Sequence, residues 1–315
     1  MKLSVIIPAY NEEESFPKFY PSLLKVIIDT VGKSYEIVMV NDGSSDGTLK
    51  LLQDIANQNK KLRVVNFSRN FGKEIAVTAG ISYAQGEAII IIDADGQHPP
   101  ELIPKFVKLW EDGYQVVIGV RESNQKEGLT KRYGSKLFYK LLNVTSDTTL
   151  IAGATDFRLI DRAVQAEFIQ FSEHYRITRG LIDWMGFRRA TIPFHANKRI
   201  AGQASYRVSK LIRLALNSFV SLSVAPLYIF GYVGAFITFG AFMVGLFVII
   251  EQLILGDPLG LRVTGTAMLS ILTLFLVGIL LISQGLISVY LSHVHAQTQN
   301  RPLFIVDKQN SIRLT

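Results

Sequence analysis

The sequence predicts an α/β domain with a Rossmann-like, mostly parallel sheet, followed by helices that associate with a membrane. Short runs rich in Val and Ile alternate with helical patterns over the first 200 residues, which is typical of a parallel sheet covered on both faces. Further along, residues 214–250 and 263–292 contain no charged side chain. Each of these stretches exceeds the roughly 20 apolar residues that a helix needs to cross a bilayer.

Strands and helices are expected to alternate along the first part of the chain. Ranges dominated by Val, Ile or Leu predict strands at 3–8, 36–40, 62–67, 88–92 and 115–120. Helical patterns predict helices that begin near residue 12 and that cover 48–58, 72–84 and 99–110. The last of these starts with Pro99-Pro100, at a position where proline is well tolerated. A sheet of this kind binds its ligand beyond the carboxyl ends of its strands.

The segments at those carboxyl ends are polar and acidic. They read PAYNEEE, VNDGSSDGT, FSRNFGKE and DADGQHPPE. Turn formation explains their Gly, Asn and Ser residues, but it does not require an acid at the end of three separate strands. No strand is followed by GxGxxG, and GxxxxGK[ST] does not occur. A nicotinamide dehydrogenase and a P-loop nucleotidase are therefore disfavoured.

Asp93 and Asp95 follow the isoleucine run 89–92 directly. Two carboxylates spaced in this way after a strand can approach one hard cation, and Gln97 can add a further oxygen. Mg²⁺ and Mn²⁺ accept such ligands and complete their shells with water and substrate phosphates. A cation held here would neutralise the charge that develops on a diphosphate leaving group. His98 is expected to be a loop residue rather than a ligand.

Four motifs in this order, PAYNEEE, NDGSSDGT, DADGQHPPE and TDFRLID, resemble those of family-2 glycosyltransferases with a GT-A fold. The closer resemblance is to polyprenyl-phosphate glycosyltransferases, the group of dolichyl-phosphate mannose synthase and bactoprenol glucosyltransferase. It continues through GQASYRVSKLIRLAL into the two apolar stretches, which favours the bactoprenol type. The resemblance implies inverting transfer of a hexose, with glucose as the default, from a UDP-sugar to undecaprenyl phosphate for cell-envelope glycosylation.

The resemblance also implies roles for individual residues. Those matched to the nucleotide-sugar site are Pro8, Ala9, Tyr10, Glu12, Asp42, Asp93, Ala94, Asp95 and Gln97, and Asp93, Asp95 and Gln97 are also matched to the site for Mg²⁺ or Mn²⁺. Those matched to the lipid-phosphate site are Arg121, Arg132, Ser135, Lys198 and Arg199. Asp156, Asp95 and Arg132 are matched to catalytic positions. Many relatives read GQSKY where this chain reads GQASY at 202–206, so Lys198, Arg199 or Arg207 would have to replace that lysine.

The chemistry of the acceptor limits what Asp156 can do. A phosphate monoester has a second pKa near 6 and is mostly ionised at pH 7, so it needs cationic positioning more than a strong base. Asp156 is therefore expected to orient a sugar hydroxyl or an acceptor-binding arginine such as Arg158, rather than to act as a general base.

The charges predict how the chain meets a membrane. Nine Lys or Arg and one acid, Asp183, fall between Arg176 and Arg213, directly before the first apolar stretch. By the positive-inside rule both termini are expected on the cytoplasmic side of the plasma (inner) membrane. The expected order is catalytic domain, amphipathic surface helix, first span, external loop, second span and cytoplasmic tail, at 1–204, 205–218, 219–250, 251–263, 264–292 and 293–315.

The tail contains RPLFIVD, whose weak alternation could add a strand at a subunit contact, and the resemblance implies a homotetramer. The chain has no cysteine, so neither a disulfide nor a thiolate metal site is expected. A basic block can also indicate nucleic acid, but its position beside a membrane span favours lipid phosphate and anionic lipid.

Three alternatives remain open at this level. The same fold could transfer N-acetylglucosamine or galactose, or it could use another acceptor, such as a diacylglycerol-type lipid or a growing polysaccharide. A non-enzymatic membrane scaffold is the alternative from a different class, although a scaffold has no need of the acidic strand ends. The two apolar stretches contain no ionisable pathway residue, which disfavours a transporter subunit.

Overall fold

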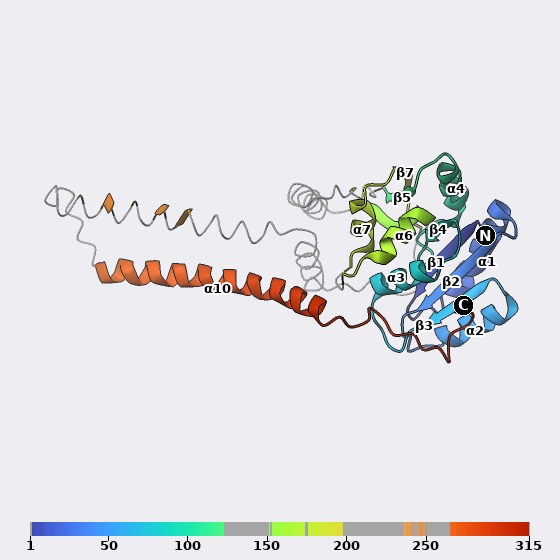
Figure 1. The fold of residues 1–315 in the computed structure, drawn as a ribbon, viewed down its shortest axis with the longest axis horizontal. Coiled ribbons are helices and arrows are strands. Elements are labelled where there is room, and N and C mark those ends of the chain that lie inside the picture. Colours follow the sequence, from blue (N-terminus) through green and yellow to red (C-terminus); the bar gives the residue numbers. More distant parts are fainter. Residues whose placement is uncertain are drawn as a thin grey trace. The chain divides into compact units, whose positions relative to one another are not determined.

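The structure of the chain is a computed structural model (Figure 1). It describes residues 2–122, 151, 153–173, 176–197 and 265–314, together with scattered positions between 236 and 250. The chain divides into two compact units: Met1–Ile212 with Arg301–Thr315, and Arg213–Asn300.

The first unit is built around a mixed sheet. Within the described residues this sheet has seven strands, in the order β3-β2-β1-β4-β6-β5-β7. The neighbours β3, β2, β1 and β4 run parallel, as do β5 and β7, whereas β6 runs antiparallel between β4 and β5. The strands are β1 (Leu3–Ala9), β2 (Tyr35–Asn41), β3 (Leu62–Asn66), β4 (Ala88–Ile91), β5 (Val116–Arg121), β6 (Ala154–Asp161) and β7 (Arg189–Phe194). The expected mostly parallel sheet is thus confirmed.

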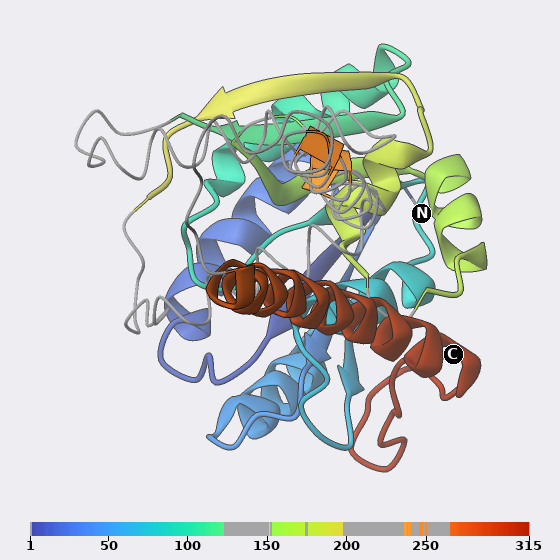
Figure 2. The ribbon, with the colours of Figure 1, turned by 90° about the vertical axis from the view of Figure 1, so that its left-hand side faces the viewer.

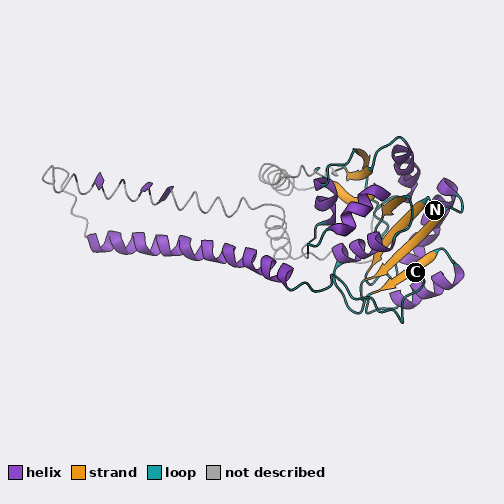
Figure 3. Ribbon diagram, viewed as in Figure 1, coloured by secondary structure: helices purple, strands orange, loops and turns teal. Residues whose placement is uncertain are grey.

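Helices cover both faces of this sheet (Figure 3). They are α1 (Phe16–Val31), α2 (Thr48–Gln58), α3 (Lys73–Tyr83), the 3₁₀ turn η1 (Pro100–Leu102), α4 (Ile103–Glu111), α6 (Arg162–Gln170) and α7 (Thr178–Trp184). Side chains of α1, α2 and α4 join one hydrophobic cluster, and side chains of α3, α6 and α7 join the other. Successive residues of β1 alternate between the clusters, because strand side chains point to opposite faces.

Helix α1 begins later than the sequence pattern predicts. It starts at Phe16, with Pro17 in its first turn, whereas the expected start was near residue 12. The intervening residues are tied to the β2–α2 loop instead: Glu12 N donates to Thr48 Oγ1 at 2.8 Å, and Glu13 N donates to Asp46 Oδ2 at 3.3 Å. These contacts keep the segment at the end of β1 as a loop.

Strand β6 was not predicted, because half of its residues are polar. Phe157 and Leu159 contribute to one hydrophobic cluster and Ile160 contributes to the other. Asp156 and Arg158 therefore lie on the same face of the strand as Ile160. Because β6 lies between β4 and β5, it brings the carboxylate of Asp156 into the middle of the sheet.

The C-terminal tail belongs to the first unit and lies beside β3 (Figure 2). Val306 pairs with Phe67 and Ile312 pairs with Val64, both antiparallel, and the ring of Phe304 stacks on that of Phe67 with centroids 5.2 Å apart. The tail was expected to pair at a subunit contact. The structure places this pairing within the chain, where it covers an otherwise open sheet edge.

The second unit contains α10 (Gly265–Thr298), a helix of 34 residues. Its segment Phe275–Ser292 has a mean hydropathy of 2.0, and it makes α10 the one helix, among those that the structure describes, that is long and apolar enough to cross a membrane. The expected second span at 264–292 falls on this helix. The expected surface helix at 205–218 and external loop at 251–263, and most of the expected first span at 219–250, lie outside the described residues.

Candidate active site

The parallel strands bring three polar segments to one edge of the sheet. Ala9 of β1 pairs with Asn41 of β2, and Asp42 N continues the ladder by donating to Ala9 O at 2.9 Å. β4 pairs in parallel with β1 on its other side. Tyr10, Asp42 and Asp93 therefore all follow the carboxyl ends of neighbouring strands, as the sequence predicts.

The first of these segments matches the expected nucleotide loop. Pro8 and Ala9 are buried in β1, whereas the Tyr10 ring is 48% exposed. Asn11 takes a left-handed backbone conformation with φ of 55°, and its Oδ1 accepts from Ser45 N at 2.9 Å. The β2–α2 loop thus holds the backbone conformation at Asn11, the residue that follows the exposed Tyr10.

The carboxylate of Asp42 is already engaged by the neighbouring loop. It accepts hydrogen bonds from Phe71 N at 2.7 Å and from Gly72 N at 2.9 Å, and the residue is only 3% exposed. Burial raises the pKa of Asp42, and the hydrogen bonds from Phe71 and Gly72 partly offset this increase. The structure therefore shows Asp42 joining two loops, and its expected contact with the base and ribose stays a prediction.

Replacing Gly43 with alanine is expected to destabilise the fold by about 2–4 kcal/mol. Gly43 has a φ of +63°, and a Cβ there would lie 2.3 Å from the backbone carbon of Arg69. Gly32 is the matched control, because its φ is +61° but nothing lies within 4 Å of an added Cβ. Gly32→Ala should cost about 1 kcal/mol of backbone strain alone. Thermal or chemical unfolding compares the two, and equal losses would argue against a tight contact between these loops.

Lys73 joins two acids at the centre of the edge. Its Nζ lies 2.7 Å from Asp93 Oδ1 and 2.9 Å from Asp156 Oδ2, and it donates to Asp93 Oδ2 at 2.8 Å. Burial opposes the charge of Lys73, but Asp93 and Asp156 raise its pKa above the ordinary value. The first acid of the DxD pair and the acid of β6 thus share one ammonium group, which sequence reasoning did not predict.

The remaining residues of the acidic turn are largely buried. Asp95 is 8% exposed, and its Oδ1 accepts from Gln97 N at 3.0 Å. Ala94 is buried beside it. His98 packs its ring on Phe157 and accepts from Asp93 N through Nδ1 at 3.2 Å. Burial lowers the pKa of His98, and the neutral ring supports this turn. His98 lies in a loop, as expected.

The part of the chain that the structure describes holds no group of three or more His, Asp or Glu side chains that could hold a metal ion. Asp93 and Asp95 nevertheless supply the carboxylate oxygens that Mg²⁺ and Mn²⁺ prefer, and both ions commonly take one or two carboxylates with substrate phosphates completing the shell. The ammonium of Lys73 against both oxygens of Asp93 shows that this position attracts positive charge. The donor set therefore fits such an ion.

The model of the family described as "Glycosyl transferase family 2" matches residues 4–168, the part of the chain that includes β1 to β6 and the acidic edge. The chain is a family 2 glycosyltransferase. Its antiparallel β6 within an otherwise mostly parallel sheet completes an α/β fold of the GT-A type.

Curated relatives match nearly the whole glycosyltransferase. An uncharacterized glycosyltransferase, sll0501, from Synechocystis is 40% identical over 97% of this chain and 95% of its own length. The uncharacterized glycosyltransferase YkcC from Bacillus subtilis is 34% identical over 99% of this chain and 95% of its own. A prophage-derived bactoprenol glucosyl transferase from Shigella flexneri is 34% identical over 98% of this chain and 99% of its own. The similarity therefore includes the apolar C-terminal part.

Asp156 of the glycosyltransferase carries a stable negative charge. Burial alone would raise its pKa, but the ion pair with Lys73 and the charges of Arg179 and Arg158 lower the pKa of Asp156 to about 2. A carboxylate with such a pKa is a poor proton acceptor near pH 7. This agrees with the hypothesis that Asp156 orients a group rather than removing a proton.

Arg158, however, is not available to an acceptor. Its side chain is 1% exposed, its Nη2 donates to Thr155 O at 3.2 Å and its Nη1 donates to Arg179 O at 3.4 Å. Its Nη1 also lies 3.6 Å from Asp183 Oδ1. The expectation that Asp156 orients Arg158 toward the acceptor is wrong, because Arg158 ties β6 to α7 inside the protein.

Helix α7 supplies a cation that the sequence did not single out. Its first residue is held by α3, because Thr178 N donates to Glu74 Oε2 at 2.8 Å. The next residue, Arg179, is half-buried, and its charge lowers the pKa of Asp156. Its position inside the basic block was the available signal, but only the packing of α7 brings this charge near Asp156.

The expected lipid-phosphate residues are only partly described. Arg121 lies exposed at the end of β5, where its N donates to Gly153 O at 2.9 Å. Arg132, Ser135, Lys198 and Arg199 lie outside the described residues. Their contribution to the site stays a prediction.

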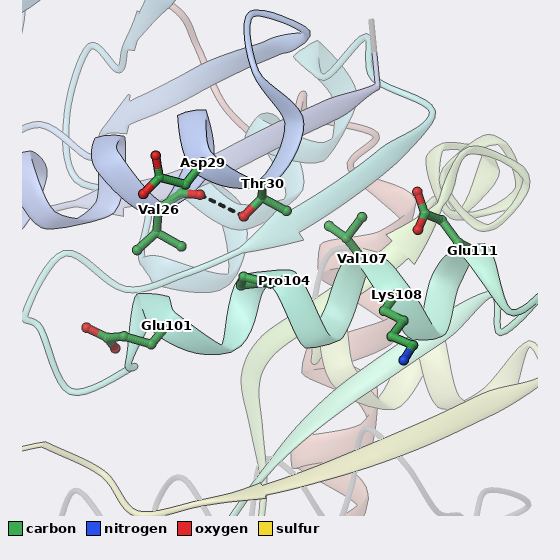
Figure 4. Close-up of a pocket in the computed structure, with 8 residues that line it drawn as sticks. All are labelled: Val26, Asp29, Thr30, Glu101, Pro104, Val107, Lys108 and Glu111. Atoms are coloured by element: carbon green, nitrogen blue, oxygen red, sulfur yellow. Dashed lines mark hydrogen bonds between the residues drawn. The ribbon is translucent and has the colours of Figure 1, made fainter.

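A surface groove between α1 and α4 has a volume of about 510 Å³ (Figure 4). Its lining consists of Val26, Asp29, Thr30, Glu101, Pro104, Val107, Lys108 and Glu111. This lining comes from α1, η1 and α4, and Tyr10, Asp42, Lys73, Asp93 and Asp156 are not part of it. The groove is therefore separate from the candidate active site.

Proposed function

We propose that the protein transfers a hexose, with glucose as the first choice, from a UDP-sugar to a polyprenyl phosphate such as undecaprenyl phosphate. The observation that carries this proposal is the similarity to bactoprenol glucosyl transferases from Shigella and its phages, which extends over 97–98% of this chain and 99% of theirs. A similarity confined to the catalytic unit would not indicate which acceptor the protein uses. Likeness that includes the apolar C-terminal part favours a shared lipid acceptor.

The reaction follows from the charges at the sheet edge. An oxygen of the lipid phosphate attacks the anomeric carbon, the bond from that carbon to the UDP diphosphate breaks, and the configuration inverts from α to β. The acceptor is already ionised at pH 7, so no residue has to remove its proton. Asp156, held ionised by Lys73, orients the donor sugar through a hydroxyl group.

Positive charge near Asp93 and Asp95 would stabilise the departing UDP. We infer that these two residues, with Gln97, hold Mg²⁺ or Mn²⁺, and the ion would neutralise the diphosphate as its bond to the sugar breaks. Tyr10, Glu12 and Asp42 would bind the uridine side of the donor. Arg121, with Arg132, Ser135, Lys198 and Arg199, would position the lipid phosphate through charge-assisted hydrogen bonds.

A membrane location completes the proposal, because a polyprenyl phosphate stays in the bilayer. Helix α10 would form one span, and the apolar stretch 219–250 would form another, with both termini on the cytoplasmic side of the plasma membrane. The segment 205–218 would lie on the membrane surface. A homotetramer is proposed from the resemblance alone.

Turnover with defined substrates tests the proposal directly. Detergent-purified protein is incubated with undecaprenyl phosphate, Mn²⁺ or Mg²⁺, and UDP-glucose, UDP-galactose or UDP-N-acetylglucosamine, and UDP release and a glycolipid labile to mild acid are measured. The expected result is glycolipid formation with UDP-glucose, lost in EDTA and in Asp95→Asn. UDP release that ignores the lipid phosphate would reject this acceptor, and an absence of turnover from folded protein would reject the proposed donors and acceptor together.

A further inference from the structure

A chain of hydrogen bonds connects the C-terminal tail to the first nucleotide loop. Asn66 Nδ2 donates to Asp307 Oδ2 at 3.3 Å, and Asn41 Nδ2 donates to Asn66 Oδ1 at 2.7 Å. Ser44 Oγ donates to Asn41 Oδ1 at 2.5 Å, and Asn11 N donates to Ser44 Oγ at 3.0 Å. The chain crosses from the tail through the ends of β3 and β2 to the segment that follows β1.

Every bond in this chain is donated in the same direction, toward the Asp307 carboxylate. Hydrogen bonds aligned in this way polarise and strengthen one another, and a negative charge at the accepting end favours the alignment. Asn310 and the backbone N–H of Gln309 also donate to Asp307, and these bonds keep its pKa below the ordinary value. Asp307 is therefore ionised at neutral pH.

The middle of the chain is shielded from water. Asn41 is 1% exposed and Asn66 is 5% exposed, so a broken bond would leave buried polar atoms without partners. At the far end, Asn11 holds a left-handed backbone conformation with φ of 55°. The bond from its N–H to Ser44 helps to maintain that conformation, and Asn11 lies between Tyr10 and Glu12.

The tail also supports the loop on the other side of the nucleotide site. Ser68 N donates to Ile305 O at 3.0 Å, and Asp307 N donates to Asn66 O at 2.8 Å. The segment after Ser68 leads to Phe71 and Gly72, whose N–H groups hold the Asp42 carboxylate. Both loops that surround Asp42 thus depend on the same stretch of tail.

We propose that the tail segment 305–310 is a positioning element for the donor site, in which Asp307 acts through Asn66, Asn41 and Ser44 to hold the loop at 10–12 ready for the nucleotide. The inference rests on the proposed function, in which that loop binds the UDP moiety. The proposal gives the residues that follow α10 a role in donor affinity. The alternative is that they only cover the edge of β3.

A charge exchange between the tail and β3 tests the proposal. Asn66→Asp places a second carboxylate against Asp307 and removes the donor between them, so the Kd for UDP should rise about tenfold at pH 8. Asp307→Asn alone should raise the Kd about threefold, since one oxygen is retained. In the double variant Asn66→Asp/Asp307→Asn, the amide at position 307 donates to the carboxylate at position 66. The Kd for UDP should therefore return to within about twofold of the wild type.

Arg313→Ala is the matched control. Arg313 Nη1 anchors the same tail by donating to Ala56 O and Leu62 O, both at 2.8 Å, but it is not part of the chain that ends at Asn11. Its loss should lower the melting temperature while leaving the Kd for UDP within about twofold of the wild type. Isothermal titration of the full-length protein in detergent measures the Kd, and steady-state kinetics should show the effect of Asn66→Asp in KM for the UDP-sugar rather than in kcat.

Each outcome decides the proposal. Weaker binding in Asn66→Asp that the double variant restores supports it. Unchanged binding in Asn66→Asp, failure of the double variant to restore the Kd, or an equal loss in Arg313→Ala would overturn it and leave the tail a purely structural role. A wild-type protein that binds no UDP would overturn the proposed function and the inference together, whereas normal wild-type binding with any of the preceding failures would overturn the inference alone.

Discussion

Replacing Lys73 with methionine is expected to lower kcat about 100-fold and, at the same time, to tighten the binding of Mn²⁺. The ammonium of Lys73 contacts both oxygens of Asp93 and one oxygen of Asp156. A divalent ion that binds Asp93 must compete with that ammonium, so its removal should favour the ion. The same change leaves Asp156 without its nearest counter-charge, which disturbs the group that orients the sugar.

Two measurements separate these effects. Titration of Mn²⁺ by electron paramagnetic resonance reports ion binding in the absence of any turnover, and kcat is measured at saturating Mn²⁺. Lys73→Arg is the control, since it keeps the positive charge and should retain more activity than Lys73→Met. Weaker Mn²⁺ binding in Lys73→Met would show that Lys73 supports the ion instead of competing with it.

The importance of Lys73 could not be predicted from its motif. FSRNFGKE was identified as one of the polar strand ends, but a lysine at the start of a helix is usually solvated. Its partners come from the turn after β4 and from β6, and β6 itself was missed because Asp156 and Arg158 interrupt its apolar pattern. Once that strand is inserted beside β4, the side chain of Lys73 lies between two carboxylates.

The parts of the fold that were predicted correctly are those with strong local patterns. The range 48–58 was expected to be helical and is α2, and the five predicted strands overlap β1 to β5. The tail pairing with β3 depends on two isolated bridges between residues more than 200 positions apart, so no local pattern could locate it. Periodicity predicts elements well, whereas the contacts that shape the site depend on which elements become neighbours.

Arg158 shows the same limit at the level of one side chain. Once β6 is known to be a strand, the spacing of Asp156 and Arg158 places both on the same face. It does not show that α7 covers the second of them, which leaves Arg158 1% exposed and bonded to the backbone of Arg179. Two residues apart on one strand thus have different roles: Asp156 faces the acidic edge, and Arg158 holds the elements that surround it.

Replacing Asp156 with asparagine is expected to lower kcat by about 100- to 1,000-fold, and by the same factor at every pH from about 6 to 9. Its pKa of about 2 lies below the ordinary value of 3.8, so the carboxylate stays ionised throughout this range. The stabilisation that the ion pair with Lys73 gives the folded protein is therefore present above about pH 4, and it is lost as pH falls through about 2. Both the protonation of Asp156 and the loss of this stabilisation therefore occur well below pH 6, outside the range in which turnover is measured.

A pH–rate profile of Asp156→Asn beside the wild type distinguishes the two possible roles of this carboxylate. If Asp156 removed a proton, the loss would shrink at high pH, where the acceptor phosphate is fully ionised without help. If the pH–rate profiles of Asp156→Asn and the wild type run parallel, the carboxylate of Asp156 acts through its negative charge, which orients the donor sugar in the transition state. Asp161→Asn on the same strand is the control: Asp161 caps α6 through Ala163 N and accepts from Trp110 Nε1, away from the acidic edge, so its change should leave kcat within about twofold of the wild type.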